Sequence, residues 1–168
     1  MPGRTATEQL LISAAADDAA AALRLDLPDE RKAFVDTSNF EGIDAKYAIS
    51  AIKEALLKQG VRLADARAEA DTIIEIRSGA LSIDQTETMY GIPATDFGAV
   101  KSPEAPLFNS RFQQGIAKFA AFAYDAETGE FLASAGPVYG VVGREGNQLF
   151  STFVWEKRDI RTDPGDWR

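Results

Sequence analysis

The stretch from Ala70 to Ala80 constrains the fold more than any other part of the chain. It reads Ala-Asp-Thr-Ile-Ile-Glu-Ile-Arg-Ser-Gly-Ala, a β-branched run that follows a charged segment. Threonine and isoleucine favour strands, because a branched side chain packs well on a pleated, half-buried surface. We therefore expect a central strand from about Asp71 to Ile83, with the rest of the chain assembled around it.

An alanine-rich segment near the start of the chain predicts a first helix. Thr5 and Glu8 have the spacing of a capping box, in which the side chain of each bonds the backbone N–H of the other. The helix should run to about Leu23, since alanine is the best helix former. Its small side chains predict close packing on a sheet. The residues expected on its buried face are Leu10, Leu11, Ala14, Ala15 and Ala22 or Leu23.

A second helix is expected from Ala45 to about Gln59. Asp44 can cap its first turn, and Gly60 stands where a helix-ending glycine belongs. The apolar residues that recur there at helical spacing are Ala48, Ile49, Ile52, Ala55 and Leu56. This pattern predicts that one face of the second helix is buried.

Short strands are expected over most of the remaining chain. Residues 32–37 and 61–63 flank the second helix, and an antiparallel meander follows residue 113. The meander's expected parts are strands at 115–124, 130–135, 138–142 and 149–155, a hairpin loop at 125–129 and a turn at 143–147. The predicted fold class is α+β: a two-layer mixed β-sheet with two main helices packed on one face, in the order α-β-α-β-β-(long loop)-β-β-β.

One domain, residues 1–168, is expected from the length of the chain. Residues 84–113 show no clear period, so we expect a long aromatic loop, and loops of this length are usually functional or disordered. Its aromatic content argues against simple disorder. Residues 156–168 are expected to form a charged C-terminal tail. The candidate interaction residues of the loop are Tyr90, Ile92, Phe97, Leu107 and Phe108.

The composition excludes several kinds of chemistry. The chain has no cysteine and no histidine, which removes thiolate nucleophiles, zinc–sulfur sites and the commonest general base. A serine paired with Lys101 or Lys118 stays open as a nucleophile, but no spacing favours it. The net charge of −8 disfavours nucleic acid, which binds clustered lysine and arginine. We expect no enzyme, no cofactor and no metal site.

The first group of acidic residues that could act as a site lies where the first strand meets the second helix. Asp36, Glu41 and Asp44 could together bind a hard cation or carry out acid–base chemistry. The preferred interpretation is a helix cap beside solvated acids.

A second acidic group surrounds the start of the central strand and comprises Glu69, Asp71 and Glu75. On a strand, Asp71 and Glu75 would lie about 13 Å apart, too far for one proton-transfer pair. Strand-edge charge is the preferred interpretation. The glycine-rich run at 136–146 has neither the spacing nor the following helix of a phosphate loop, so it is expected to supply turns.

Two sequence motifs resemble bacterial cell-envelope families. Gly-Val-Arg-Leu at 60–63, a charged link, and the run at 70–79 resemble the N-terminal domain of the TolB family of the Tol–Pal system and the curli-secretion lipoprotein family. The resemblance implies a helix packed on a mixed sheet. In those families the strand that begins Ala-Asp starts the core.

A closer resemblance is carried by residues 4–13, 34–38, 77–80 and 90–93, which are similar to a family of uncharacterised proteobacterial envelope lipoproteins. This resemblance implies no activity, because that family has no assigned role. It implies that a lipid-carrying cysteine and a signal precede this stretch in the native form. Met1-Pro2-Gly3 reads like an added start on a mature chain, and no apolar run approaches the roughly 20 residues of a spanning helix.

Three hypotheses for function follow. The first is a non-enzymatic module of the cell envelope, facing the periplasm and attached to the outer membrane through a lipid anchor, that binds a protein partner or self-associates. The second is a small-ligand-binding domain with the loop at 84–113 as a lid. The third, and least favoured, is a hydrolase that uses carboxylates.

Overall fold

The structure is a computed structural model and describes residues 5–28, 31–92, 95–96, 101–102, 105–149 and 153–161, with side chains described for 5–28, 31–88 and 110–145. In chain order, the elements are α1 (Ala6–Ala22), β1 (Lys32–Asn39), α2 (Ala45–Lys58), β2 (Arg62–Leu63), the 3₁₀ helix η1 (Arg67–Glu69), β3 (Thr72–Ile92), β4 (Thr95–Asp96), β5 (Lys101–Ser102), β6 (Ala105–Asp125), β7 (Phe131–Leu149) and β8 (Phe153–Arg161).

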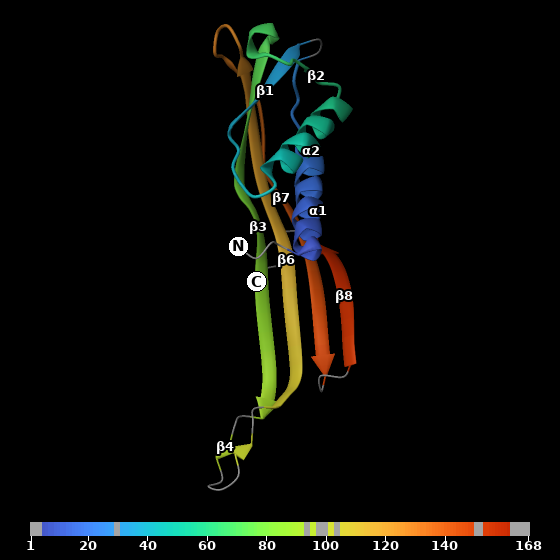
Figure 1. Cartoon of the computed structure of the whole chain (residues 1–168). Coiled ribbons are helices and arrows are strands. Elements are labelled where there is room, and N and C mark those ends of the chain that lie inside the picture. The colour runs from blue at the N-terminus through green and yellow to red at the C-terminus, as the bar shows by residue number, and fades with distance from the viewer. Residues whose placement is uncertain are drawn as a thin grey trace.

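One mixed sheet carries six of the strands, in the order β2-β1-β3-β6-β7-β8. β1 runs parallel to both β2 and β3, whereas β3, β6, β7 and β8 alternate in direction. β4 and β5 form a separate two-stranded ribbon at the far end of the long hairpin (Figure 1). The predicted α+β class, with a mixed sheet and helices on one face, is confirmed.

The helix α1 lies across β6 and β7 and also contacts α2 (Figure 1). The predicted capping box is present, because the Glu8 N–H donates to Thr5 Oγ1 at 3.2 Å and the Thr5 N–H donates to Glu8 Oε2 at 2.9 Å. The predicted buried face is wrong at Leu10, which is 62% exposed. The residues of α1 that are buried are Leu11, Ile12, Ala15, Ala16, Ala19 and Ala20.

Two glycines of the sheet determine how closely α1 approaches. A Cβ atom at Gly140 in β7 would lie 1.9 Å from the carbonyl oxygen of Ala15, and one at Gly115 in β6 would lie 2.2 Å from that of Leu11. Any side chain at these positions would push the helix away. The backbone of α1 therefore rests directly on the sheet, where the expected close packing through small residues is found.

The helix α2 begins and ends where the sequence predicts, but its cap differs. Asp44 has a φ of 65° and makes no side-chain capping bond, so its predicted role as an N-cap side chain is wrong. The backbone at this residue is left-handed, whereas a side-chain N-cap usually has an extended backbone. Gly60 has a φ of 90°, as a helix-ending glycine should. The buried residues of α2 are Ala48, Ile52 and Leu56, all on the predicted face.

The long loop predicted at 84–113 is replaced by two strands. β3 continues to Ile92 and β6 begins at Ala105, and the two pair from Asp84↔Gln114 to Ile92↔Ala105. Residues 84–88 are exposed at every position, so neither face of the strand is apolar. Without alternation between polar and apolar residues, the sequence carries no strand signal here.

The meander also differs from the prediction beyond residue 142. The turn expected at 143–147 is wrong, because β7 runs without interruption to Leu149. The last strand is shifted, and the part of the predicted tail up to Arg161 belongs to β8 and pairs with β7. The remainder of the predicted tail, 162–168, lies outside the described residues. Four glycines within 136–146 suggested turns, yet β7 runs through all four; Gly136 has a positive φ, beside the register shift opposite Phe119 and Ala121.

Replacing Gly140 with alanine tests the contact between α1 and the sheet. The added methyl group would overlap backbone atoms of Ala15 and Ala19, so we expect unfolding to become easier by at least about 2 kcal/mol. Thermal and urea unfolding followed by circular dichroism would measure the loss. Gly79→Ala is the matched control, because its Cβ would meet only the flexible side chain of Lys118, at 2.9 Å. Equal stability of the two variants would contradict the close packing.

Candidate functional site

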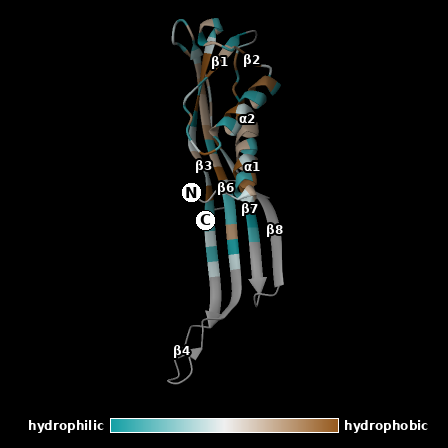
Figure 2. Cartoon of the chain, in the orientation of Figure 1, coloured by the Kyte–Doolittle hydropathy of each residue, from teal (hydrophilic) through white to brown (hydrophobic). Residues whose placement is uncertain are grey.

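The most unusual surface of the molecule is the part of the sheet that no helix covers. We call it the β-extension and define it as residues 86–92, 105–112, 145–149 and 153–157. In Figure 1, β3, β6, β7 and β8 continue well past the end of α1, and neither helix lies over this part. Figure 2 shows that the described residues of the long strands become more hydrophilic toward it. In the described part of the extension, Thr86, Glu87 and Thr88 are exposed, as expected of a surface that meets solvent or a partner.

Four of the candidate interaction residues fall on the extension: Tyr90, Ile92, Leu107 and Phe108. Tyr90 of β3 is directly opposite Phe108 of β6, and Ile92 is opposite Ala105. Leu107 lies beside Phe108 on β6, and Phe97 lies outside the described residues. The pairing thus brings Tyr90 and Phe108 together, although the loop predicted to carry them is a hairpin.

The same row of the sheet contains two apolar residues that sequence reasoning missed. Phe108 pairs with Leu149 of β7, which in turn pairs with Phe153 of β8. Because the sequence predicted a turn at 143–147, it placed Leu149 and Phe153 on one strand and not on neighbouring strands. Only the strand register could have revealed this row of apolar residues at the distal end.

The first acidic group does not form a site for chemistry. Ser38 donates to Asp36 Oδ1 from its hydroxyl at 2.5 Å and from its N–H at 2.9 Å, and Arg67 lies 3.1 Å from Oδ2. These hydrogen bonds, with the Ser38 hydroxyl first, lower the pKa of Asp36. The backbone of Glu41 bonds to Ser78. Within the described ranges, no three acidic side chains are close enough to hold a metal ion.

The second acidic group is divided between two residues of β1, Lys32 and Asn39. Lys32 binds Glu69 with its ammonium at 3.1 Å and donates to Asp71 from its backbone N–H at 3.1 Å. Asn39 donates to Glu75 Oε1 at 2.7 Å. These interactions connect β1 to the start of β3, so the carboxylates have a structural role in the fold.

Arg67 makes polar contacts to two strands that lie on either side of β3. Its guanidinium donates to Asp36 on β1 at 3.1 Å and to the hydroxyl of Tyr124 on β6 at 2.9 Å, so it spans β3. Tyr124 stacks on Phe122 with ring centroids 6.1 Å apart, and Ile73 between them and β1 is fully buried. Arg67 therefore shields an apolar part of this face. Nothing in the sequence singled out this residue.

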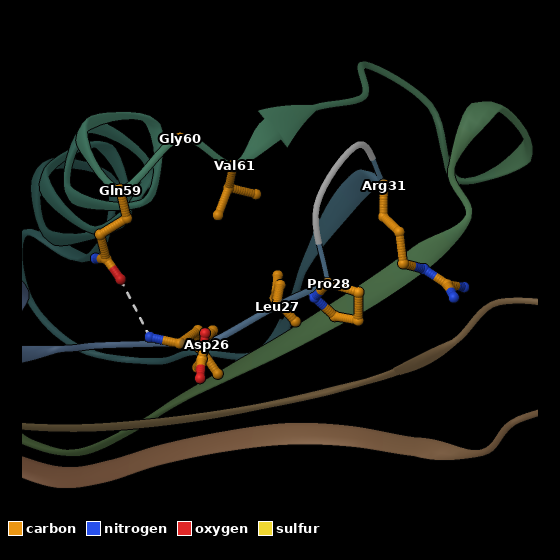
Figure 3. A pocket seen from close by; sticks show the side chains of 8 residues that line it. Asp26, Leu27, Pro28, Arg31, Gln59, Gly60 and Val61 are labelled. Atoms are coloured by element: carbon orange, nitrogen blue, oxygen red, sulfur yellow. Dashed lines mark hydrogen bonds between the residues drawn. The ribbon is translucent and has the colours of Figure 1, made fainter.

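A small cavity of about 170 Å³ lies where the segment after α1 passes the end of α2 (Figure 3). Its lining residues are Leu25, Asp26, Leu27, Pro28, Arg31, Gln59, Gly60 and Val61. Gln59 accepts from the Leu25 N–H at 3.1 Å and donates to the carbonyls of Leu23 and Ala55. Ligand pockets are usually larger, about 300–1,000 Å³, and this one lacks the aromatic residues expected of a lid. The cavity is best understood as space left where the segment after α1 packs against the end of α2.

Asp125 holds the hairpin between β6 and β7 and ties it to the segment before β1. Its Oδ1 accepts from the N–H groups of Thr128 at 2.8 Å and Glu127 at 3.0 Å, and its Oδ2 accepts from Arg31. The Thr128 N–H, followed by the Arg31 guanidinium and the Glu127 N–H, holds the pKa of Asp125 well below its usual range. Arg31 also donates to the buried Thr72 at 2.8 Å.

None of the helices in the described part of the chain is both long and apolar enough to cross a membrane. The model of one protein family, described as a family of unknown function (DUF6655), matches residues 1–144. This match ends within β7, before β8 begins. Among curated proteins, none matches the chain.

Asp125→Asn should destabilise the protein most at neutral pH. A carboxyl whose pKa is lowered by folding stabilises the native state above its unfolded pKa of about 3.9 and loses that effect as the pH falls through the lower native value. We therefore expect the melting temperature of the variant to be a few degrees below the parent at pH 7 and to approach it below about pH 4. Glu130→Gln, in the same hairpin, is the control for lost charge. A constant difference between pH 3 and pH 7 would contradict this role of Asp125.

Proposed function

The chain belongs to the family of unknown function DUF6655, and we propose that it acts as a non-enzymatic protein-interaction or assembly module of the cell envelope. The β-extension is the observation that supports this most. Four strands continue beyond the helix layer, the described residues 84–88 of β3 are exposed, and the strand pairing places Tyr90, Phe108, Leu149 and Phe153 in one row near the end. A sheet with no layer on either face offers backbone edges and side chains to a partner protein.

The described polar groups support an interaction role in preference to a catalytic one. Asp36, Glu69, Asp71 and Glu75 are each bound by groups within the fold, and so is Asp125. Catalytic acids and bases usually stand in a cleft with room for a substrate. The cavity beside Gln59 is small, and the side-chain amide of Gln59 is bonded within the protein.

We place this module on the periplasmic side of the outer membrane, held in its native form by a lipid anchor. The support is the resemblance of residues 4–13 to lipoproteins of the envelope. Expression of the full-length native gene, with labelling by a palmitate analogue and fractionation of the cells, tests the assignment. Label in the protein and recovery with outer membranes are the expected results, and an unlabelled cytoplasmic protein would contradict it.

A photo-reactive residue in place of Thr86, which is exposed on β3, should cross-link to another protein chain in the native envelope. The control is the same photo-reactive residue in place of Lys53, which is exposed on α2 and so lies outside the sheet. We expect a discrete adduct at position 86 and little at position 53. Adducts at position 53 alone would place the interaction on the helix layer and contradict the proposal.

Shortening the β-extension tests the same function by removal. Joining Thr88 to Asn109 with a short glycine–serine turn deletes residues 89–108 and keeps strand pairs such as Thr88↔Ser110. Because the buried core lies under α1 and α2, we expect the circular dichroism spectrum and melting temperature to stay close to those of the parent. The adduct at position 86 should be lost. A folded variant that still forms the adduct would show that residues 89–108 are not needed for the proposed interaction.

A further inference from the structure

The sheet has two long open edges in the part that continues past the end of α1. β1 pairs with β3 only as far as Asn39↔Arg77, and the segment around Glu41 and Gly42 contacts β3 near Ser78 and Leu81. Among the described residues, no strand pairs with that side of β3 from residue 82 to residue 92, a length of about 36 Å. The outer side of β8 likewise has no strand partner in the described ranges. Unpaired strand edges of this length are templates for pairing with another chain.

The directions of the strands make the two edges compatible with each other. β3, β6, β7 and β8 alternate in direction, and there are four of them, so the two edge strands are antiparallel. When a second copy stands beside the first in the same orientation, its β8 meets β3 as an antiparallel neighbour. The ladder would therefore continue from copy to copy, with the helices of each copy on the same face.

The charges of the two edges favour one register. If the rows of the two copies were level, Asp84 would stand opposite Asp159, and Glu87 opposite Glu156. If β8 moves by two residues, so that Arg161 takes the place of Asp159 opposite Asp84, every side chain stays on its face and both repulsive pairs are removed. The pairs that result are Asp84 with Arg161, Glu87 with Arg158, Thr88 with Lys157, Tyr90 with Trp155 and Ile92 with Phe153.

We propose that copies of this chain join head to tail, with β8 of one copy paired antiparallel to residues 84–92 of β3 in the next, in this shifted register. The inference rests on the proposed function and names the partner of the β-extension as a second copy. Since the contact uses two different surfaces, the assembly either closes into a ring or grows as a filament. In solution, the parent chain should therefore sediment as a species larger than a monomer.

Single cysteines provide a direct test, because the chain has none of its own. Thr88→Cys and Lys157→Cys are made as separate variants, checked for folding by circular dichroism and mixed under mild oxidation. We expect a disulfide-linked dimer in the mixture and little in either variant alone. Thr86→Cys mixed with Lys157→Cys is the matched control for the level register. Two residues of displacement along a strand move the Cα atoms about 7 Å, which is too far for a disulfide.

Charge reversal tests the register independently. Asp84→Arg in the Thr88→Cys chain should reduce the dimer yield several-fold, and Arg161→Asp in the Lys157→Cys chain should restore it. Glu54→Arg, on the exposed side of α2, should leave the yield unchanged. A higher yield from the control with cysteine at position 86 would overturn the register, as would a failure of Arg161→Asp to restore the yield.

Two other results would overturn the proposal as a whole. Efficient disulfide formation by Lys157→Cys alone would show symmetric pairing of two β8 strands. A chain that stays monomeric by sedimentation at all concentrations would show that copies do not pair. If such a monomer still forms the adduct at position 86 with a different protein, the inference fails but the proposed function stands.

Discussion

The contact between the backbone of α1 and the sheet is the constraint on which the rest of the structure depends. Gly115 and Gly140 leave space that the carbonyl oxygens of Leu11 and Ala15 occupy, so the helix lies at one height and over two particular strands. Four alanines, together with Leu11 and Ile12, are the buried residues of the helix. Arg144 then donates to Thr7 at 3.0 Å and joins the start of the helix to β7. α2 packs beside α1, and the residues between and beneath the helices form the core.

This arrangement divides the sheet into two halves of different character. Where α1 lies, β6 alternates strictly, with Ala117, Phe119, Ala121 and Ala123 buried and their neighbours less so. Past the end of α1, residues on both faces of β3, such as Asp84 and Glu87, are exposed. The paired backbone of neighbouring strands, with cross-strand contacts such as Arg111 to Glu87 at 3.4 Å, maintains the sheet there.

The sequence predicted the fold best wherever burial imposes a pattern. It located both helices, the capping box at Thr5, the strand at 115–124 and the hairpin loop that ends at Gly129. It placed Leu11, Ala15 and Leu23 correctly on the buried face of α1 but was wrong at Leu10. An alanine-rich helix has little contrast between its sides, and the glycines that decide its position belong to distant strands. Its candidate residues Tyr90 and Phe108 are paired on neighbouring strands. That Leu149 and Phe153 continue the same row could be recognised only from the register of β7 with β6 and β8. The roles of Arg67 and Arg31 depend on contacts between remote segments, which no local pattern reveals.

The great length of β3 and β6 has a mechanical consequence. Each strand has 21 residues and passes without a break from the distal end into the layer beneath α1. A force applied to the tip along the strands would load many backbone hydrogen bonds at once in shear, and it would reach the core directly. A force that peels β8 sideways would instead break its pairs with β7 one after another. The molecule is therefore stiff along its long axis and weak at its β8 edge.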